Sequence, residues 1–197
     1  ANPSVTATAA VTITYTPDTS QPYYNEMMPG STIGSVTVNY SILPQTALTR
    51  YDGPTATTGQ SDLDDSPRAY RKFFGSVLVE SNIEVVVQVN VEARADGDGQ
   101  AGSYNGIPVG EATPTVVAPV ILADFYGYYT TLVVQNTTST ASTCAITYTS
   151  DSTYSAVRNQ SKSYTHVLPA NGSFTVYEGR KGGLEIGDIN KDTFWRA

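Results

Sequence analysis

Apolar and uncharged polar side chains alternate along the first part of the chain. Val5, Ala7, Ala9, Val11 and Ile13 fall on one face of an extended segment, and mainly threonines fall on the other. A period of two predicts a β-strand with one buried face. The pattern holds for longer than the roughly five or six residues of a typical strand. The sequence therefore predicts a long first strand.

The rest of the chain shows the same period and no helical period. Glycine, proline, asparagine and aspartate punctuate the apolar segments, as expected for an all-β protein with many turns. The further predicted strands are Ser35–Tyr40, Ser76–Val79, Ile83–Val91, Thr115–Leu122, Tyr128–Gln135, Thr143–Thr149, Ser163–Leu168 and Ser173–Tyr177.

Short sequences recur between the two halves of the chain. Ile13–Thr16 recurs as Ile146–Thr149, and Gly34–Val38 is similar to Gly172–Val176. Repeats of this kind indicate related structural units. The fold class predicted is all-β, with two tandem β-sandwich domains of the Ig-like or jelly-roll type. Their expected bounds are 1–93 and 115–197, with 94–114 as a glycine-rich linker.

The two copies match only in part. The first continues past Phe74 into strand patterns at Val77–Val79 and Ile83–Val91, whereas the second opens with Val116–Ile121 and Tyr128–Gln135. Each copy therefore lacks strands that the other has, and a sandwich without a strand exposes edges that proteins normally pair or cover. Two explanations remain open: the chain is a segment of a longer repeat-built protein, or neighbouring subunits complete one another by strand donation.

Under strand donation, the N-terminal segment is the expected assembly strand. Its apolar face, formed by Val5, Ala7, Ala9, Val11 and Ile13, would fill successive pockets of the next subunit. A head-to-tail contact of this kind propagates into a homopolymer instead of closing a dimer. The alternative is that the segment is simply the first strand of its own domain.

Composition narrows the classes of function. The chain has 11 basic and 18 acidic side chains, a formal net charge of −7, and only 15% charged residues. The acidic balance argues against nucleic-acid binding, which needs clustered lysine and arginine. No apolar run reaches the roughly 20 residues of a membrane-spanning helix. A polar surface rich in threonine, serine and asparagine favours an extracellular or cell-surface location.

Aromatic and turn motifs of the second half form a further pattern. Phe125–Thr130 is followed by Val133–Thr138, Ala145–Tyr148 and Pro169–Ser173, and Ser103–Gly106 comes before them. This pattern resembles the tandem β-sandwich repeats of secreted surface proteins of filamentous bacteria. The resemblance implies a structural, non-enzymatic component of a wall or appendage, and it carries no catalytic residues over.

The candidates for catalysis are few. His166 is the single histidine, and no Gly-x-Ser-x-Gly motif accompanies it. Cys144 aligns with the apolar Val11 of the first copy, so we interpret it as a small core residue. The single cysteine also excludes an intramolecular disulfide framework. The sequence thus predicts no enzyme, no catalytic residue and no bound cofactor.

Acidic clusters provide weak candidates for calcium. Asp188, Asn190 and Asp192 match the first ligands of a calcium loop, but Thr193 stands where the loop needs glycine. Asp96 and Asp98 lie in the glycine-rich segment and form a second weak candidate. No metal site is predicted with any specificity.

Surface chemistry suggests two further features. Asn39, Asn136, Asn159 and Asn171 each begin an Asn-x-Ser/Thr sequence and are candidate glycosylation sites. The aromatic cluster around Tyr126 and Tyr128, together with Tyr23 and Tyr24, could stack on sugar rings; the alternative is that these rings cap a core. Polysaccharide is therefore a second candidate partner.

The sequence as a whole favours a structural subunit of an extracellular filament or surface array, assembled head-to-tail through its N-terminal strand. The alternatives are a monomeric carbohydrate-binding or adhesive module, and a segment of a longer repeat-built surface protein. No motif identifies an adhesion target.

Overall fold

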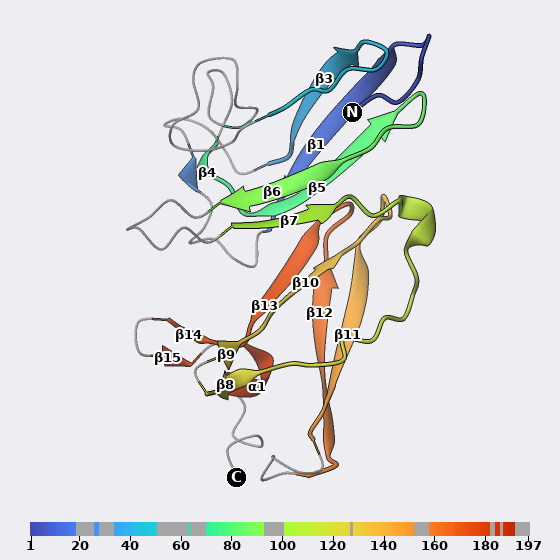
Figure 1. The fold of residues 1–197 in the computed structure, drawn as a ribbon. Helices are drawn as coiled ribbons and strands as arrows, with labels where there is room; N and C mark the ends of the chain where they lie inside the picture. Colours follow the sequence, from blue (N-terminus) through green and yellow to red (C-terminus); the bar gives the residue numbers. More distant parts are fainter. Residues whose placement is uncertain are drawn as a thin grey trace. The chain divides into compact units, whose positions relative to one another are not determined.

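A computed structural model describes residues 1–18, 26–27, 34–50, 63, 70–92, 101–126, 128–151, 158–181, 184–185 and 187–191. The regular structure is mostly β, arranged as several small antiparallel sheets (Figure 1). In the described ranges the helical elements are the 3-10 turn η2 (Val109–Glu111) and the short α1 (Asp188–Lys191). The all-β prediction is therefore confirmed at this level. None of the helices described is long and apolar enough to span a membrane.

The chain separates into two compact units. Unit 1 comprises Ala1–Tyr15, Glu26–Phe73 and Val77–Pro114, and unit 2 comprises Thr16–Asn25, Phe74–Ser76 and Thr115–Ala197. Part of the expected linker 94–114 is instead folded: β7 (Ala101–Asn105) pairs with β6 (Gln88–Glu92). Valine alternates with polar residues in β6, which is the pattern of a strand. The backbone edge of that strand is the partner with which β7 pairs.

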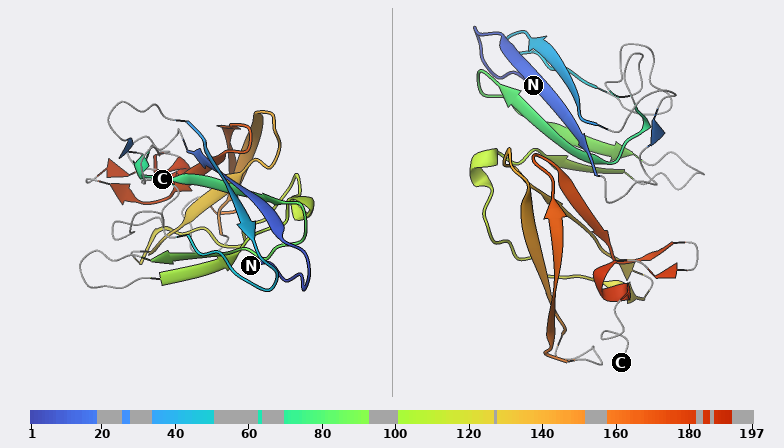
Figure 2. Two further views of the ribbon diagram at one scale, coloured as in Figure 1. Left: turned by 90° about the horizontal axis from the view of Figure 1, so that it is seen from above. Right: turned by 180° about the vertical axis from the view of Figure 1, so that it is seen from behind.

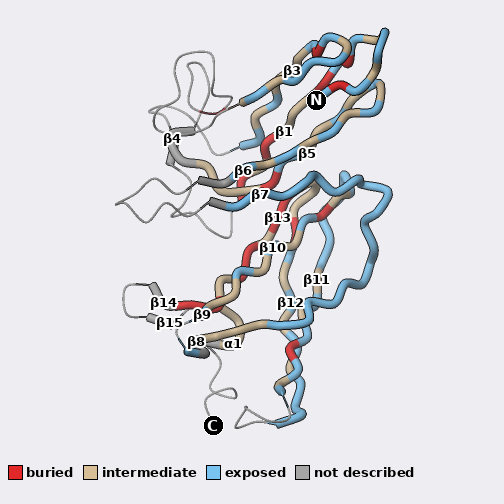
Figure 3. Tube along the Cα trace, viewed as in Figure 1, coloured by how far each residue is buried: buried red, intermediate tan, exposed pale blue. Residues whose placement is uncertain are grey.

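The largest sheet has the strand order β3-β1-β5, where β1 is Ala9–Pro17, β3 is Val36–Ile42 and β5 is Gly75–Ser81. Ala9, Val11 and Ile42 form a buried cluster, which appears as red segments of the trace (Figure 3). Burial at Ala9, Val11 and Tyr15 follows the alternation predicted from the sequence. β2 (Glu26–Met27) and β4 (Tyr70–Lys72) form a separate two-stranded antiparallel ladder.

The first strand is shorter than predicted. Val5 is 70% exposed and precedes β1, and Ala7 is half-buried in the same turn region. The Ser4 hydroxyl accepts the amides of Thr6 and Ala7, and these bonds bend the backbone before the strand begins. β1 then pairs on both sides within its own chain, which corresponds to the alternative in which it serves its own domain.

The second half forms short ladders and one long hairpin (Figures 1 and 2). The hairpin consists of β11 (Ser142–Thr149) and β12 (Ser161–Leu168). The ladders pair β10 (Thr131–Gln135) with β13 (Ser173–Tyr177), β8 (Ala123–Phe125) with β9 (Tyr128–Tyr129), and β14 (Arg180–Lys181) with β15 (Leu184–Glu185).

The predicted strand Thr115–Leu122 is wrong. The segment is irregular, and Val116 and Val117 are 81% and 82% exposed. Pro114 and Pro119 bracket these valines, and a proline cannot donate to a sheet ladder. The segment consequently leaves β-branched side chains open to solvent.

The hairpin β11–β12 repeats the pairing of β1 with β3. Ile13 faces Val38 in the first pair, and Ile146 faces Tyr164 in the second. The hydroxyls of Thr14 and Thr37 lie 3.2 Å apart across the first pair, and those of Thr147 and Ser163 lie 2.6 Å apart at the matching place in the second. β3 therefore corresponds to β12, and the predicted correspondence of Gly34–Val38 with Gly172–Val176 in β13 is wrong.

A buried asparagine joins each repeated hairpin to the segment before it. In the first copy, the Asn2 side chain is 1% exposed and donates to the carbonyl oxygens of Ala7 and Ile42 at 2.8 and 2.9 Å. Its Oδ1 accepts the Ser4 amide, and its backbone amide donates to Thr46. The Asn2 side chain thus makes three hydrogen bonds that hold this turn against the end of β3.

Asn136 has the same role in the second copy. Its Nδ2 donates to the carbonyl oxygens of Thr140 and Pro169 at 2.7 and 3.0 Å, its Oδ1 accepts the Thr138 amide, and its backbone amide donates to Gly172. The turns that follow the two hairpins also agree, because Gln45 and Asn171 have φ values of 55° and 52°. We call Asn2 and Asn136 the corner asparagines.

Replacing a corner asparagine is expected to destabilise the fold. Asn136→Ala removes several buried hydrogen bonds, each worth about 1 kcal/mol net, and leaves carbonyl groups without partners. We expect the free energy of unfolding, measured by urea denaturation, to fall by about 2–3 kcal/mol. The matched control is Asn39→Ala at an exposed position of β3, where the side chain only accepts an exposed hydrogen bond from Thr12, and it should change stability by less than about 0.5 kcal/mol. Equal small losses in both variants would contradict the structural role of the corner.

Candidate functional site

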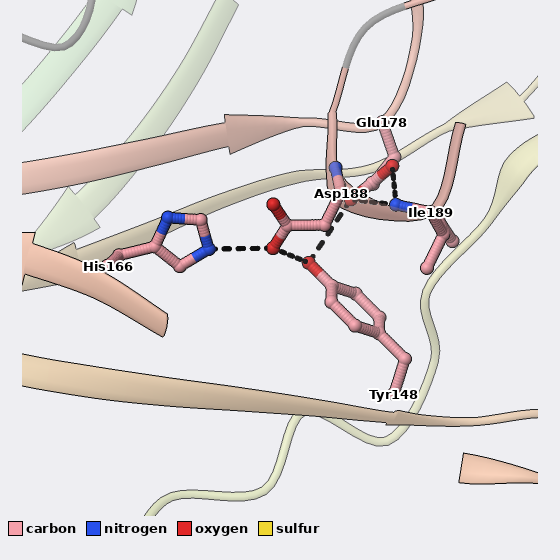
Figure 4. A network of polar contacts seen from close by, with 5 residues as sticks. All are labelled: Tyr148, His166, Glu178, Asp188 and Ile189. Carbon is pink, nitrogen blue, oxygen red and sulfur yellow. Dashed lines mark hydrogen bonds and ion pairs between the residues drawn. The ribbon is translucent and has the colours of Figure 1, made fainter. Parts of the chain in front are cut away.

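Four polar side chains of unit 2 form a connected network of hydrogen bonds (Figure 4). Tyr148 comes from β11, His166 from β12, Glu178 follows β13, and Asp188 begins α1. Antiparallel pairing of β11 with β12 fixes the first two side chains, and the loop after β13 brings the two carboxylates to them. We call these four residues the carboxylate cluster.

Glu178 is the centre of the cluster and is only 1% exposed. Its Oε1 accepts the backbone amide of Asp188 at 2.9 Å, and its Oε2 accepts that of Ile189 at 3.2 Å. These amides belong to the first turn of α1, where a helix leaves donors unpaired. The Glu178 side chain therefore caps α1, and both of its oxygens are used in doing so.

Gly187 allows the backbone before α1 to lie close to the Glu178 carboxylate. Its φ is +97°, a value that side-chain-bearing residues rarely adopt. A Cβ at this position would collide with Glu178 Oε2 and lie 2.7 Å from the Tyr177 carbonyl oxygen. The turn between β15 and α1 thus needs glycine for both its backbone conformation and its contact with Glu178.

Tyr148 links the two carboxylates. Its hydroxyl oxygen is 3.1 Å from Glu178 Oε1 and 3.1 Å from Asp188 Oδ2. A hydroxyl carries one proton, so it donates to one of these oxygens at a time. Burial raises the pKa of Tyr148 far above its ordinary value of 10, and the charges of Glu178 and Asp188 raise it further. The phenol remains protonated and serves as a hydrogen-bond donor.

His166 completes the cluster. Its Nε2 lies 2.8 Å from Asp188 Oδ2, and its ring stacks on Phe174 with centroids 3.8 Å apart. An aspartate–histidine pair is also part of a catalytic triad, but catalysis then needs a nucleophile bonded to the histidine. Cys144 faces His166 in the β11–β12 register, yet no hydrogen bond joins its thiol to the imidazole. These described residues hold no activated nucleophile.

The first copy carries a related set of residues in its sequence. Tyr15 corresponds to Tyr148, because Ile13 and Ile146 hold the same place in the repeated hairpins. Counting on from the matching turns at Gln45 and Asn171 aligns Tyr51-Asp52-Gly53 with Tyr177-Glu178-Gly179 and Asp62-Leu63 with Asp188-Ile189. Asp52 and Asp62 lie outside the described residues, whereas Leu63 is buried against Tyr15.

Recurrence in two copies favours a structural role for the carboxylate cluster. In the sequence, the tyrosine of the repeated hairpin and the two acidic positions aligned with Glu178 and Asp188 recur, whereas the place of His166 is taken by Tyr40, which faces Val11 as His166 faces Cys144. In unit 2 the tyrosine and the acidic residues cap α1 and hold a turn, and the histidine belongs to one copy alone. Sequence reasoning missed the roles of Tyr148 and Glu178; the repeated Ile-Thr-Tyr-Thr segment contains Tyr148, and the repeated Tyr-Asp/Glu-Gly motif contains Glu178.

The calcium candidates do not come together in the described chain. The Asp188 carboxylate is bonded to Tyr148 and His166, and the side chain of Asn190 is not described. Asp96, Asp98 and Asp192 lie outside the described residues. Within the ranges that are described, no group of three or more metal-ligating side chains is positioned to hold a metal ion.

The candidate glycosylation sites differ in accessibility. Asn39 and Asn159 are exposed, and Asn171 is half-buried in its turn. Asn136 is 8% exposed and uses both hydrogens of its side-chain amide in the corner. A glycan needs that nitrogen, so the folded structure argues against Asn136 as an acceptor.

The aromatic candidates for sugar stacking are partly exposed. Tyr126 and Tyr128 are 87% and 67% exposed near the β8–β9 turn, whereas Tyr129 is half-buried with its ring 6.2 Å from that of Tyr177. Tyr23 and Tyr24 lie outside the described residues, and the side chain of Phe125 is not described. Two exposed rings close in sequence remain compatible with a sugar platform.

Comparisons with known proteins add no assignment: the chain matches no protein-family model, no curated protein and no solved structure at a significant level.

Gly187→Ala is expected to destabilise unit 2 by about 2–4 kcal/mol, because a Cβ adds both a positive-φ penalty and a collision with Glu178. Urea denaturation measures the loss. Gly110→Ala is the matched control, since a Cβ there meets no atom within 4 Å. A loss no larger than that of the control would show that the turn relaxes without cost.

The raised pKa of Tyr148 predicts loss of stability at high pH. Above pH 10 the unfolded tyrosine loses its proton while the folded one keeps it, so the folded state binds more protons. The contribution is complete below pH 10 and falls by up to about 1.4 kcal/mol per pH unit above it. In urea denaturation, Tyr148→Phe should be less stable than wild type near pH 7, and this difference should shrink above pH 10. A constant difference across that range would contradict the assignment.

Proposed function

We propose that the protein is a structural component of an extracellular filament or surface array, built from repeated β-sandwich copies of the Ig-like or jelly-roll type. The single observation that carries the proposal is the recurrence of one structural unit. Each copy has a corner asparagine, a hairpin, a left-handed turn residue and a tyrosine at the matching strand position, and the acidic residues that contact this tyrosine in unit 2 align with acidic residues in the sequence of the first copy. The corner asparagines stabilise backbone turns in both copies.

Exposed apolar segments support assembly. Val116, Val117 and Val120 are 81%, 82% and 65% exposed in an irregular segment. Clustered apolar side chains of this kind on a protein surface commonly mark a contact with another molecule. The occupant we propose is a second copy of the chain, which is consistent with the low proportion of charged residues and with the structural character of the repeated residues.

In this proposal the contact between two copies of the chain does not use β1 as a donated strand. β1 is the central strand between β3 and β5, and Ala9 and Val11 are buried against Ile42. Donating this strand would break its own sheet at a cost comparable to the folding free energy. Removing Ala1–Ala10 would also delete Asn2 and Ala9, so that truncation should impair folding as well as assembly.

Electron microscopy of the native material tests the proposal. Regular filaments or arrays of the 21.0 kDa repeat-built chain are expected. Val116→Asp with Val117→Asp should lower the assembled fraction by about tenfold or more, because placing two carboxylates in an apolar joint costs well over about 1.4 kcal/mol. The control is Val167→Asp on β12, where the side chain is 68% exposed. Monomeric particles at every concentration would overturn the proposal.

A second candidate is a carbohydrate-binding module, favoured by the exposure of Tyr126 and Tyr128. It requires saturable binding of a soluble polysaccharide that is lost in Tyr128→Ala, with Tyr129→Ala leaving the stacking face intact. Each stacked ring contributes about 0.5–1.5 kcal/mol, so the affinity should fall several-fold. Binding that is unchanged in Tyr128→Ala would eliminate this candidate.

A further inference from the structure

The sequence contains two Asn-Gly pairs, Asn105-Gly106 and Asn171-Gly172, and the fold places them in different surroundings. An asparagine followed by glycine closes a cyclic imide when the glycine amide nitrogen attacks the side-chain carbonyl carbon of the asparagine. Glycine favours this attack, since it has no Cβ to crowd the approaching nitrogen. The nitrogen must leave its hydrogen bond, and the peptide must rotate. Restraint of the backbone therefore decides which pair reacts.

Backbone hydrogen bonds hold Asn171-Gly172 in the corner of unit 2. The Asn171 amide donates to the Thr138 carbonyl oxygen at 2.9 Å, and the Gly172 amide donates to that of Pro169 at 3.1 Å. The Gly172 carbonyl oxygen accepts the Asn136 amide at 2.8 Å. Gly172 is buried, and a Cβ on it would lie 3.0 Å from the Pro169 Cβ. This pair is thus restrained by bonding and by packing.

A side chain restrains the same peptide from its other side. Ser76 is 7% exposed, and its hydroxyl donates to the Asn171 carbonyl oxygen at 3.0 Å. The peptide group between Asn171 and Gly172 is therefore bonded at both its oxygen and its nitrogen. It cannot rotate toward the Asn171 side chain without breaking both bonds.

The other pair lies where a ladder ends. Asn105 is the last residue of β7 and pairs with Gln88, and both Asn105 and Gly106 are exposed. The Gly106 amide donates to the Val87 carbonyl oxygen at 2.9 Å, one residue beyond the paired strands. In the described ranges β6 and β7 pair only with each other. The end of a two-stranded ladder in water opens at low cost in free energy, so the Gly106 nitrogen is released often.

We propose that Asn105 is a site of spontaneous modification with water as the reagent, and that the fold protects Asn171. The Gly106 nitrogen bonds to Asn105 Cγ, and the side-chain amide nitrogen leaves as ammonia with the proton of the Gly106 amide. Water then adds to one carbonyl carbon of the imide and breaks its bond to the nitrogen. Opening at the side-chain carbonyl gives aspartate, and opening at the main-chain carbonyl gives isoaspartate.

The modification changes the end of β7 in charge and in backbone length. Either product adds one negative charge to a chain whose formal net charge is −7. Isoaspartate also carries the main chain through its side chain, and the added methylene disrupts the pairing with Gln88. The new carboxylate directly precedes Ile107, which is 81% exposed. This inference stands independently of the function proposed above.

Peptide mapping by mass spectrometry tests the proposal on the full chain, produced in a host that adds no N-linked glycans. The chain is incubated in mildly alkaline buffer, once folded and once unfolded in urea. In the folded chain, Asn105 should convert at least about tenfold faster than Asn171, because the rate follows the population of the open backbone. In urea the two rates should agree within about threefold, since neither backbone is then restrained.

Three variants assign the cause of the difference. Ser76→Ala should raise the rate at Asn171 several-fold and leave the rate at Asn105 unchanged. Ser41→Ala, at an exposed position of β3, is the matched control and should change neither rate. Asn105→Gln should abolish conversion at that peptide, because glutamine closes its larger ring far more slowly. A cooperative urea transition reports that each variant is folded.

Equal rates at the two asparagines of the folded chain would overturn the proposal. Conversion at Asn105 that occurs only in urea would also overturn it, because the bond between Gly106 and Val87 would then be sufficient protection. An unchanged rate at Asn171 in folded Ser76→Ala would refute the role given to the Ser76 hydroxyl.

Discussion

In the part of the chain that the structure describes, few apolar side chains are fully buried, so hydrogen bonds between buried backbone groups carry more of the structure. The main buried cluster consists of Ala9, Val11 and Ile42, which are small or medium side chains. Hydrogen bonds that are buried are costly to leave unmade, so their partners must be placed with care. The two corner asparagines supply such partners where each hairpin meets the segment before it.

Hydrogen bonding also explains how the carboxylate cluster can be buried. Glu178 is nearly inaccessible, and it is stable there because the Asp188 and Ile189 amides and the Tyr148 hydroxyl surround it. A buried carboxylate without such donors would shift toward its neutral form. Gly187 lets the backbone approach closely enough to supply them. The cluster therefore replaces packing as the means of fixing the loop after β13.

Alternation in the sequence identified most of the strands, because a half-buried strand must repeat every two residues. It placed β11, β12 and β13 within one or two residues of their observed bounds. It failed at Thr115–Leu122, where apolar content predicted a strand and Pro119 prevents regular pairing. It also matched β3 to the wrong strand, because Gly-Ser-x-Thr-Val is a local similarity and pairing depends on distant partners. The roles of Asn136 and Glu178 required contacts that single residue types do not reveal.

The arrangement around Ala1 has a mechanical consequence. Ala1 bonds to Val86 on one side and Asn2 bonds to Thr46 on the other, and the Asn2 side chain is tied to Ala7 and Ile42. Tension applied along the chain at this point loads these bonds in shear, so that they must rupture together. Tension that separates the ends of β11 and β12 would instead open their ladder one pair at a time. A polymer linked through the first kind of joint would resist stretching far better than one linked through the second.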